Sequence, residues 1–229
     1  MELIIDTSTR FASVAVAKES EIVGSSSWES ERNHSVELVP SINTLLSRLK
    51  ITTDQIESVY VTVGPGRFSA LRVGISTAKS FAKTREIPLV PLNTLEVEAI
   101  PYIHLGMPTY ALIGAGKSKV YSARYPEGSI NQNSGVYLVE SHSEIGNSVE
   151  QQTLFCGEGV PEVSDIIKDR VGKKAVFAET TLPSRQPQVM SKLGYDLTLS
   201  GKIADPDSLQ PIYMKANQIL SANRQKKEI

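Results

Sequence analysis

The order of the predicted elements indicates an α/β protein in which strands form a mixed sheet flanked by helices. Three apolar, β-branched segments follow one another closely at the start of the chain, at 3–5, 13–17 and 22–28. Two further apolar segments, 59–63 and 88–92, alternate with stretches of helical periodicity. An antiparallel three-stranded meander and parallel strands joined through helices therefore share one sheet.

Two helices are predicted in this first half. Apolar residues recur at helical spacing from Val36 to Leu49, and Asn33 or Ser35 is available as the N-cap. A second amphipathic segment follows Gly66, where Ser69 is placed to cap the helix.

The second half of the chain repeats this order with weaker patterns. Strands are predicted at 110–113, 120–125, 136–140 and 154–155, and helices at 160–168 and 187–193. Two tandem copies of a meander-plus-helix lobe explain this order, although the halves are not a strict sequence repeat. The polar tail at 221–229 is expected to fray.

Composition narrows the functional classes. The net charge of -1 and the pI near 6.3 argue against a broad surface for a polyanion, although a local basic patch stays open. Cys156, as the one cysteine, excludes an internal disulfide and is expected to be a small buried apolar side chain. The start of the chain lacks a basic leader, and no apolar run approaches ~20 residues, so we expect a soluble cytoplasmic protein.

The turn Gly64-Pro65-Gly66 joins an apolar strand to the second helix and resembles a phosphate cradle. The P-loop pattern fails because no lysine follows Gly74, and the dinucleotide pattern fails because Arg67-Phe68-Ser69 follows Gly66. Two interpretations stay open. The helix N-terminus could bind an anion with the help of Arg67, or the turn could be purely structural.

The helix after this turn combines small and large apolar residues. Glycine inside a helix costs on the order of 1 kcal/mol relative to alanine, so Gly74 indicates a close neighbouring backbone. That neighbour could be the protein's own sheet or a helix of another chain. The residues on this surface are Phe68, Ala70, Leu71, Gly74, Ile75, Thr77 and Ala78.

Four blocks of the sequence together resemble the TsaB (YeaZ) family. They are Ile4–Thr9, His34–Pro40, Gly64–Gly74 and the closing block Pro211–Lys215. The order and spacing of the first three match over roughly the first hundred residues. The resemblance implies the two-lobed fold of the actin, Hsp70 and sugar-kinase (ASKHA) superfamily. On that basis we expect an N-terminal partner-docking lobe at 1–104, a reduced C-terminal lobe at 105–210 and a tail at 211–229.

The resemblance also implies a role in making N6-threonylcarbamoyladenosine in tRNA. In that system TsaB is a non-catalytic scaffold for the transferase TsaD, and TsaE is the associated ATPase. We expect a heterodimer with TsaD, a homodimer in its absence, contact with tRNA only through the complex, and no membrane association. No cofactor is expected on this chain alone, and ATP or ADP is the candidate ligand of the assembled complex.

The family's dimers use helices of the N-terminal lobe, which here are the segments 36–49 and 69–83. The expected interface residues are His34, Leu38, Ile42, Phe68, Leu71, Arg72, Gly74, Ile75 and Ala78.

The metal-binding and phosphate-binding motifs of the related enzymes are only partly present in this sequence. TsaD-like proteins hold a metal with an H-x-x-x-H pair, whereas His34 is followed four residues later by Leu38. Asp6-Thr7-Ser8 resembles the first phosphate motif of the superfamily, with a simple Asx turn as the structural alternative.

A second phosphate motif departs even from the family. Its aspartate and arginine positions are Gly114 and Gly116, with Lys117 and Lys119 nearby. Gly157-Glu158-Gly159 is a weak match to an adenosine-side turn.

Three functions remain in order of preference. The first is the scaffold, and the second is a small kinase or ATPase that uses Asp6 and Ser8 with Mg-ATP. The third is a metallopeptidase, which lacks its metal pair.

Overall fold

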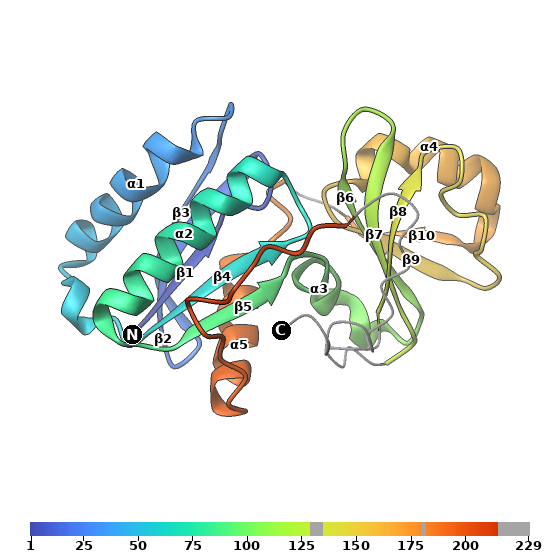
Figure 1. Cartoon of the computed structure of the whole chain (residues 1–229). Helices are drawn as coiled ribbons and strands as arrows, with labels where there is room; N and C mark the ends of the chain where they lie inside the picture. The colour runs from blue at the N-terminus through green and yellow to red at the C-terminus, as the bar shows by residue number, and fades with distance from the viewer. Residues whose placement is uncertain (129–134, 180–181, 215–229) are drawn as a thin grey trace. The chain divides into compact units, whose positions relative to one another are not determined.

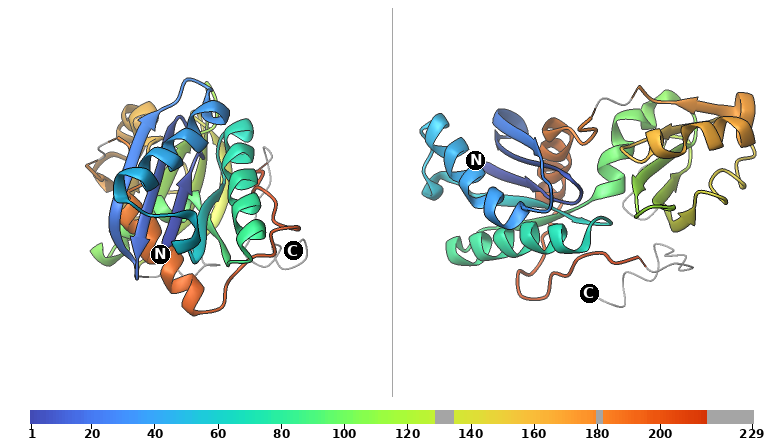
Figure 2. Two further views of the ribbon diagram at one scale, coloured as in Figure 1. Left: turned by 90° about the vertical axis from the view of Figure 1, so that its left-hand side faces the viewer. Right: turned by 90° about the horizontal axis from the view of Figure 1, so that it is seen from above.

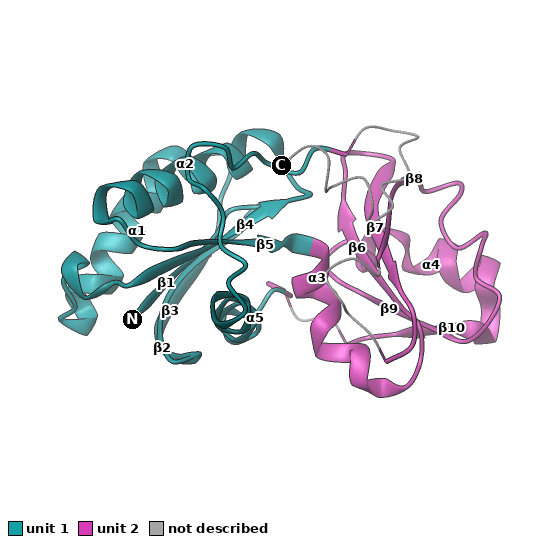
Figure 3. Ribbon diagram, turned by 60° about the horizontal axis from the view of Figure 1, so that its bottom comes forward, with its two compact units in different colours: residues 1–94, 185–213 teal, residues 95–184, 214–229 magenta. Residues whose placement is uncertain are grey.

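The computed structural model describes residues 1–128, 135–179 and 182–214, which form two compact units. Unit 1 is Met1–Thr94 with Arg185–Tyr213, and unit 2 is Leu95–Ser184 with Met214 (Figure 3). This division differs from the expected ranges 1–104, 105–210 and 211–229. The first unit ends earlier because the helix after its last strand belongs to unit 2, and the chain returns to unit 1 at Arg185. The predicted fraying tail lies outside the described residues.

Unit 1 is built on a five-stranded mixed sheet with the order β3-β2-β1-β4-β5 (Figure 1). The β1–β2 and β2–β3 pairs are antiparallel, and the β1–β4 and β4–β5 pairs are parallel. This confirms the predicted meander followed by parallel strands. Its elements are β1 (Glu2–Asp6), β2 (Phe11–Lys18), β3 (Glu21–Glu29), α1 (His34–Leu49), β4 (Ser58–Gly64), α2 (Phe68–Arg85), β5 (Leu89–Asn93) and α5 (Pro187–Leu199), with a short 3-10 turn at Thr53–Gln55.

Helices cover both faces of this sheet. Strand residues such as Val59 and Val61 share one apolar core with the buried sides of α1 and α2. Tyr60 lies between them in β4 and therefore points to the other face, where it meets Gly194 of α5. Figure 2 shows α5 on the side of the sheet away from α1 and α2. Burial on both faces explains why the apolar residues of β4 do not alternate with exposed polar ones.

Helix α2 begins one residue before the predicted cap. Arg67 is at the N-cap position with no side-chain cap, and Ser69 is inside the first turn, so the prediction of Ser69 as the N-cap is wrong. Helix α1 has Asn33 at its N-cap, which also makes no side-chain cap. Both helices end in a left-handed residue, Lys50 and Glu86.

Unit 2 repeats the topology of unit 1. Its sheet has the order β10-β9-β6-β7-β8, so β6 takes the place of β1 and the antiparallel pairs again lie to one side of it. The interpretation as two tandem lobes is confirmed by this order. The elements are α3 (Thr94–Ala99), a 3-10 helix (Ile100–Leu105), β6 (Thr109–Gly114), β7 (Lys119–Tyr125), β8 (Val136–Ser141), β9 (Thr153–Cys156), α4 (Val160–Val171), a 3-10 turn (Gly172–Lys174) and β10 (Ala175–Phe177).

The lobe is reduced because turns, not a helix, connect β8 to β9. Its core gathers apolar side chains of β6, β7, β9 and α4. Within the described residues, no helix has the length and apolar composition needed to cross a membrane.

Gly194→Ala tests how closely α5 packs on the sheet. A Cβ at Gly194 would lie 2.2 Å from Cδ2 of the buried Tyr60 ring, so the helix or ring must shift. We expect the free energy of unfolding, measured in urea, to fall by about 1–3 kcal/mol. Lys192→Ala, on the exposed side of the same helix, is the control and should change it little. An unchanged stability of Gly194→Ala would contradict this packing.

Candidate functional site

The loop that follows β1 carries the first phosphate motif, and its acid is fully buried. The Asp6 side chain is 2% exposed. Its Oδ1 accepts hydrogen bonds from the Ser8 amide at 2.9 Å, the Ser8 hydroxyl at 2.6 Å and the Thr62 hydroxyl at 2.7 Å. The Ser8 amide bond closes an Asx turn. These donors occupy one carboxylate oxygen.

Arg185 occupies the other oxygen. Its Nε donates to Asp6 Oδ2 at 2.7 Å, and the arginine side chain is 1% exposed. Its Nη2 donates to the Thr9 hydroxyl at 2.7 Å and the Phe11 carbonyl at 3.3 Å. The side chain that would orient water or a metal in a nucleotide site is therefore committed to an internal ion pair.

Two opposing effects act on the pKa of Asp6. Burial alone would raise it, but the Arg185 charge and the hydrogen bonds from Ser8 and Arg185 outweigh burial and lower the pKa below its ordinary value of 3.8. Asp6 is therefore a carboxylate at neutral pH, and its charge is compensated inside the protein.

The glycine turn supports this same loop. A Cβ on Gly66 would lie 2.2 Å from the Ser8 carbonyl oxygen, which instead accepts a hydrogen bond from the Arg67 amide at 2.7 Å. A Cβ on Gly74 would lie 2.3 Å from Thr7 Oγ1, and that hydroxyl donates to the Ala70 carbonyl at 2.8 Å. The close approach at Gly74 is therefore made by the side chain of Thr7 in the loop after β1, and not by a neighbouring backbone as predicted. These contacts favour the structural interpretation of the turn.

His34 supports the loop from α1. It is buried, and its Nε2 lies 2.9 Å from the Thr9 carbonyl oxygen. This contact explains a histidine at the start of the helix without a metal. Among the described residues, no group of three or more His, Cys, Asp or Glu side chains is placed to hold a metal ion.

Most of the expected interface residues lie inside unit 1. Seven of the nine are buried, five of them in the core shared with the sheet. The family resemblance implied these residues, and an apolar pattern at helical spacing does not distinguish core from interface. The buried seven are His34, Leu38, Ile42, Leu71, Gly74, Ile75 and Ala78. The exposed two are Phe68 and Arg72.

Those two exposed residues form a small surface cluster with Tyr213. The Phe68 and Tyr213 rings stack with centroids 4.9 Å apart, and the Arg72 guanidinium lies 4.0 Å from the Phe68 centroid. Arg72 Nε also donates to the Tyr213 hydroxyl at 3.0 Å. Tyr213 of the closing block therefore lies against the outer side of α2, and Lys215 of that block lies outside the described residues.

The second phosphate motif lies in unit 2 and has no acid of its own. Lys117 and Lys119 are exposed. A Cβ on Gly114 would lie 3.2 Å from Glu162 Oε1, so a carboxylate of α4 stands beside the position where the aspartate is missing. Sequence patterns did not indicate Glu162, because it is one of several acidic residues on an amphipathic helix.

Two further expectations in unit 2 have structural explanations. A Cβ on Gly157 would lie 2.4 Å from the Leu112 carbonyl oxygen, and the Gly159 amide donates to that oxygen at 2.9 Å. The glycines therefore allow the turn to pack on β6. Cys156 is buried as expected, and burial followed by the nearby Glu98 charge raises the pKa of its thiol well above 9.0.

Comparison with known proteins finds related sequences and a related solved structure. A Bacillus subtilis (strain 168) protein named tRNA threonylcarbamoyladenosine biosynthesis protein TsaB is 24% identical over 218 residues, which cover 93% of each chain. The solved structure of YeaZ from Pseudomonas aeruginosa has a TM-score of 0.74, with 21% identity, and covers 93% of this chain and 99% of that one. A tRNA N6-adenosine threonylcarbamoyltransferase of Anaeromyxobacter sp. (strain Fw109-5) is 33% identical over 103 residues, 40% of this chain and 29% of that protein.

A family model decides the assignment. The TsaD model, described as tRNA N6-adenosine threonylcarbamoyltransferase, matches residues 21–202. The chain belongs to this family. The relatives that match along almost the whole chain place it with the TsaB (YeaZ) proteins of tRNA threonylcarbamoyladenosine biosynthesis, and they imply a role with TsaD. The predicted ASKHA fold class is confirmed for this TsaB-family chain.

Arg185→Met tests the ion pair. It leaves the Asp6 carboxylate buried without its countercharge, so we expect the free energy of unfolding to fall by about 3–5 kcal/mol, as for other broken buried pairs. The double variant Asp6→Asn/Arg185→Met should recover part of that loss in urea titrations. Arg10→Met is the matched control because the Arg10–Glu29 pair is exposed, and it should change stability by less than about 1 kcal/mol. A loss for Arg185→Met no larger than the control's would contradict the account.

The pH dependence of stability has a definite sign. The pKa of Asp6 is lower in the folded protein, so its contribution to stability is complete above pH 3.8 and is lost as the pH falls through the lower folded value. In urea titrations from pH 6 to pH 3, the wild type should lose stability more steeply below about pH 4 than Asp6→Asn/Arg185→Met. Parallel pH curves would refute this assignment.

Proposed function

We propose that this chain is a non-catalytic scaffold subunit of the complex that makes N6-threonylcarbamoyladenosine in tRNA. In this role it binds and activates the TsaD transferase together with TsaE. The proposal rests on one observation above all: the acid of the first phosphate motif is neutralised by Arg185 and surrounded by internal donors.

The surface of unit 1 supports a docking role. Val36 and Val39 on α1 are 69% and 48% exposed, and Phe68 on α2 is 53% exposed. Figure 1 shows α1 and α2 side by side on one face of the sheet. Large apolar side chains on neighbouring helices suit a helix-packing interface. We place the TsaD contact, and the homodimer contact without TsaD, on this outer surface and not on the buried stripe.

The alternative function is a small ASKHA-fold ATPase or metabolite kinase. Glu162 beside Gly114 is the observation that favours it, since it offers a carboxylate where the second motif lacks one. The same function would also require Asp6, which would have to leave Arg185 before it could act on Mg-ATP. The scaffold therefore remains the preferred function.

Reconstitution tests the proposal directly. TsaD and TsaE, supplied with threonylcarbamoyl-adenylate, should modify tRNA when this chain is present and much more slowly without it. The chain alone should hydrolyse no ATP. Modification that does not depend on the chain would refute the scaffold, and ATP hydrolysis that is lost in Glu162→Gln would support the kinase instead.

Phe68→Asp tests the docking surface. It places a charge on the exposed side of α2, so we expect the Kd for TsaD, measured by calorimetry, to rise about tenfold or more without loss of fold. Leu199→Asp is the matched control, because Leu199 is exposed on α5 away from this surface, and it should leave the Kd unchanged. Equal effects of the two substitutions would exclude this surface.

A further inference from the structure

Strand β3 is an open edge of the sheet in unit 1. It pairs with β2 on one side, and among the described residues no backbone hydrogen bond reaches it from the other side. Every second residue of an antiparallel edge strand turns its N–H and C=O groups away from the sheet. With 9 residues, β3 is also longer than most strands. It therefore offers a row of unpaired backbone groups.

The middle of this edge lacks the usual protection against another strand. Proteins guard open edges with charged side chains, prolines or bulges. The stretch Val23–Trp28 has no charge and no proline, and after the register shift at Val23 the pairing with β2 is regular from Gly24 to Glu29. The three serines that follow Gly24 are exposed. This part of β3 can therefore accept an added strand.

Helix α1 forms a second wall beside this edge (Figure 1). Trp28 Nε1 donates to Glu37 Oε2 at 3.0 Å, and a Cβ on Gly24 would lie 2.9 Å from Cδ2 of Leu49. These two contacts hold the helix against both ends of the stretch. A cavity of about 200 Å³ lies between β3 and α1, and the residues that line it are Ser26, Pro40, Ser41, Thr44, Leu45 and Arg48.

The cavity suits a single acidic side chain. Its volume is below that of most small-molecule sites, so one side chain fits it better than a free metabolite. No acid lines it, and Ser26 and Thr44 supply hydroxyl groups. Arg48 is exposed and has no ion-pair partner among the described residues. A carboxylate accepts hydrogen bonds from both kinds of donor.

The register of β3 decides which residue of an added strand would reach this cavity. Ser26 pairs with Val14, which belongs to the core shared with α1, so Ser26 is on the face of the sheet that α1 covers. Residues directly opposite each other in a strand pair share one face. The side chain opposite Ser26 would therefore lie on the same face as the cavity and Arg48.

A second copy of this chain fits the edge poorly. Antiparallel pairing of two β3 strands about their middle residue, Ser25, would put Glu21 of each copy opposite Glu29 of the other. Like charges directly opposite each other destabilise a strand pair. The same register would put Gly24 opposite Ser26, with no side chain for the cavity. The charges therefore favour a different chain with an acid at this position.

We propose that β3 and α1 bind an extended segment of another protein by strand addition, with an aspartate or glutamate opposite Ser26. The backbone of the segment pairs with β3, and its carboxylate accepts hydrogen bonds from Arg48 and the hydroxyl groups of the cavity. The site lies at the free edge of the sheet, apart from Phe68 on α2, and the proposal does not depend on the scaffold function.

The test uses the full chain and capped synthetic peptides in which threonine and valine alternate around a variable central residue. Binding is measured by fluorescence anisotropy of labelled peptides. We expect central aspartate or glutamate to bind about tenfold or more tightly than asparagine or glutamine, since only the acids make charge-assisted hydrogen bonds. Binding of the acidic peptides should also slow hydrogen exchange in β3, whereas acetate should not, because it adds no strand.

Variants test the acidic contact. Arg48→Gln should remove the preference for the acids, and Arg67→Gln, at an exposed arginine outside the cavity, should keep it. Ser26→Asp puts a like charge opposite the acid and should weaken the acidic peptides about tenfold. The replaced residues are exposed, so we expect folded variants, with circular dichroism as the check. The proposal is overturned if no acidic peptide binds at millimolar concentration, if folded Arg48→Gln keeps the preference, or if binding leaves hydrogen exchange in β3 unchanged.

Discussion

The buried ion pair between Asp6 and Arg185 is the contact on which the rest of unit 1 depends. Both groups are almost completely removed from water, and such a pair is tolerated only when its remaining donors and acceptors are also satisfied. The Ser8 and Thr62 hydroxyls and the Thr9 side chain meet that requirement. The loop after β1 therefore has one conformation, set by electrostatics.

Neighbouring elements are shaped to hold that loop. Gly66 of the turn before α2 lets the backbone of Ser8 approach closely, and His34 contacts the Thr9 carbonyl from α1. The ion pair also joins positions 179 residues apart, and α5 begins two residues after Arg185. The same contact thus fixes the loop that resembles a phosphate motif and holds the segment before α5 in unit 1. In this structure the loop has a structural role.

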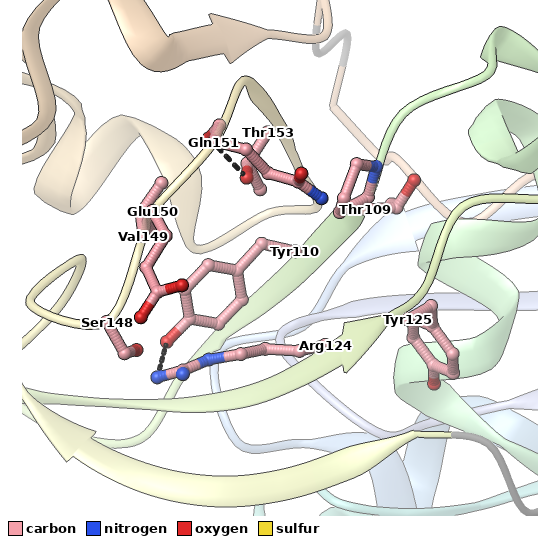
Figure 4. A pocket seen from close by; sticks show the side chains of 10 residues that line it. Thr109, Tyr110, Arg124, Tyr125, Ser148, Val149, Glu150, Gln151 and Thr153 are labelled. Atoms are coloured by element: carbon pink, nitrogen blue, oxygen red, sulfur yellow. Dashed lines mark hydrogen bonds between the residues drawn. The ribbon is translucent and has the colours of Figure 1, made fainter.

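The sequence predicted the strands and helices well because their patterns are local. It could not predict Arg185, which has no periodic or motif context and acts only through its distant partner. It also could not separate core from interface at Leu71 and Ile75, since both surroundings require apolar side chains at helical spacing. Short elements such as α3 and β10 were missed because they are too brief to show a period. The pocket in unit 2 is formed by the start of β6, the end of β7 and residues 148–153 (Figure 4). It depends on packing between segments that are distant in sequence, so no local sequence pattern predicts it.

The proposed division of labour between this chain and a catalytic partner rests on the same chemistry. A carboxylate that is already paired cannot be released for a metal or phosphate without leaving Arg185 charged in the interior, and that cost opposes nucleotide binding. Calorimetric titration of the chain alone with Mg-ATP and Mg-ADP tests this claim most directly. The account predicts no binding at millimolar nucleotide. Micromolar binding that Asp6→Asn abolishes would contradict it and would return the first phosphate motif to chemistry.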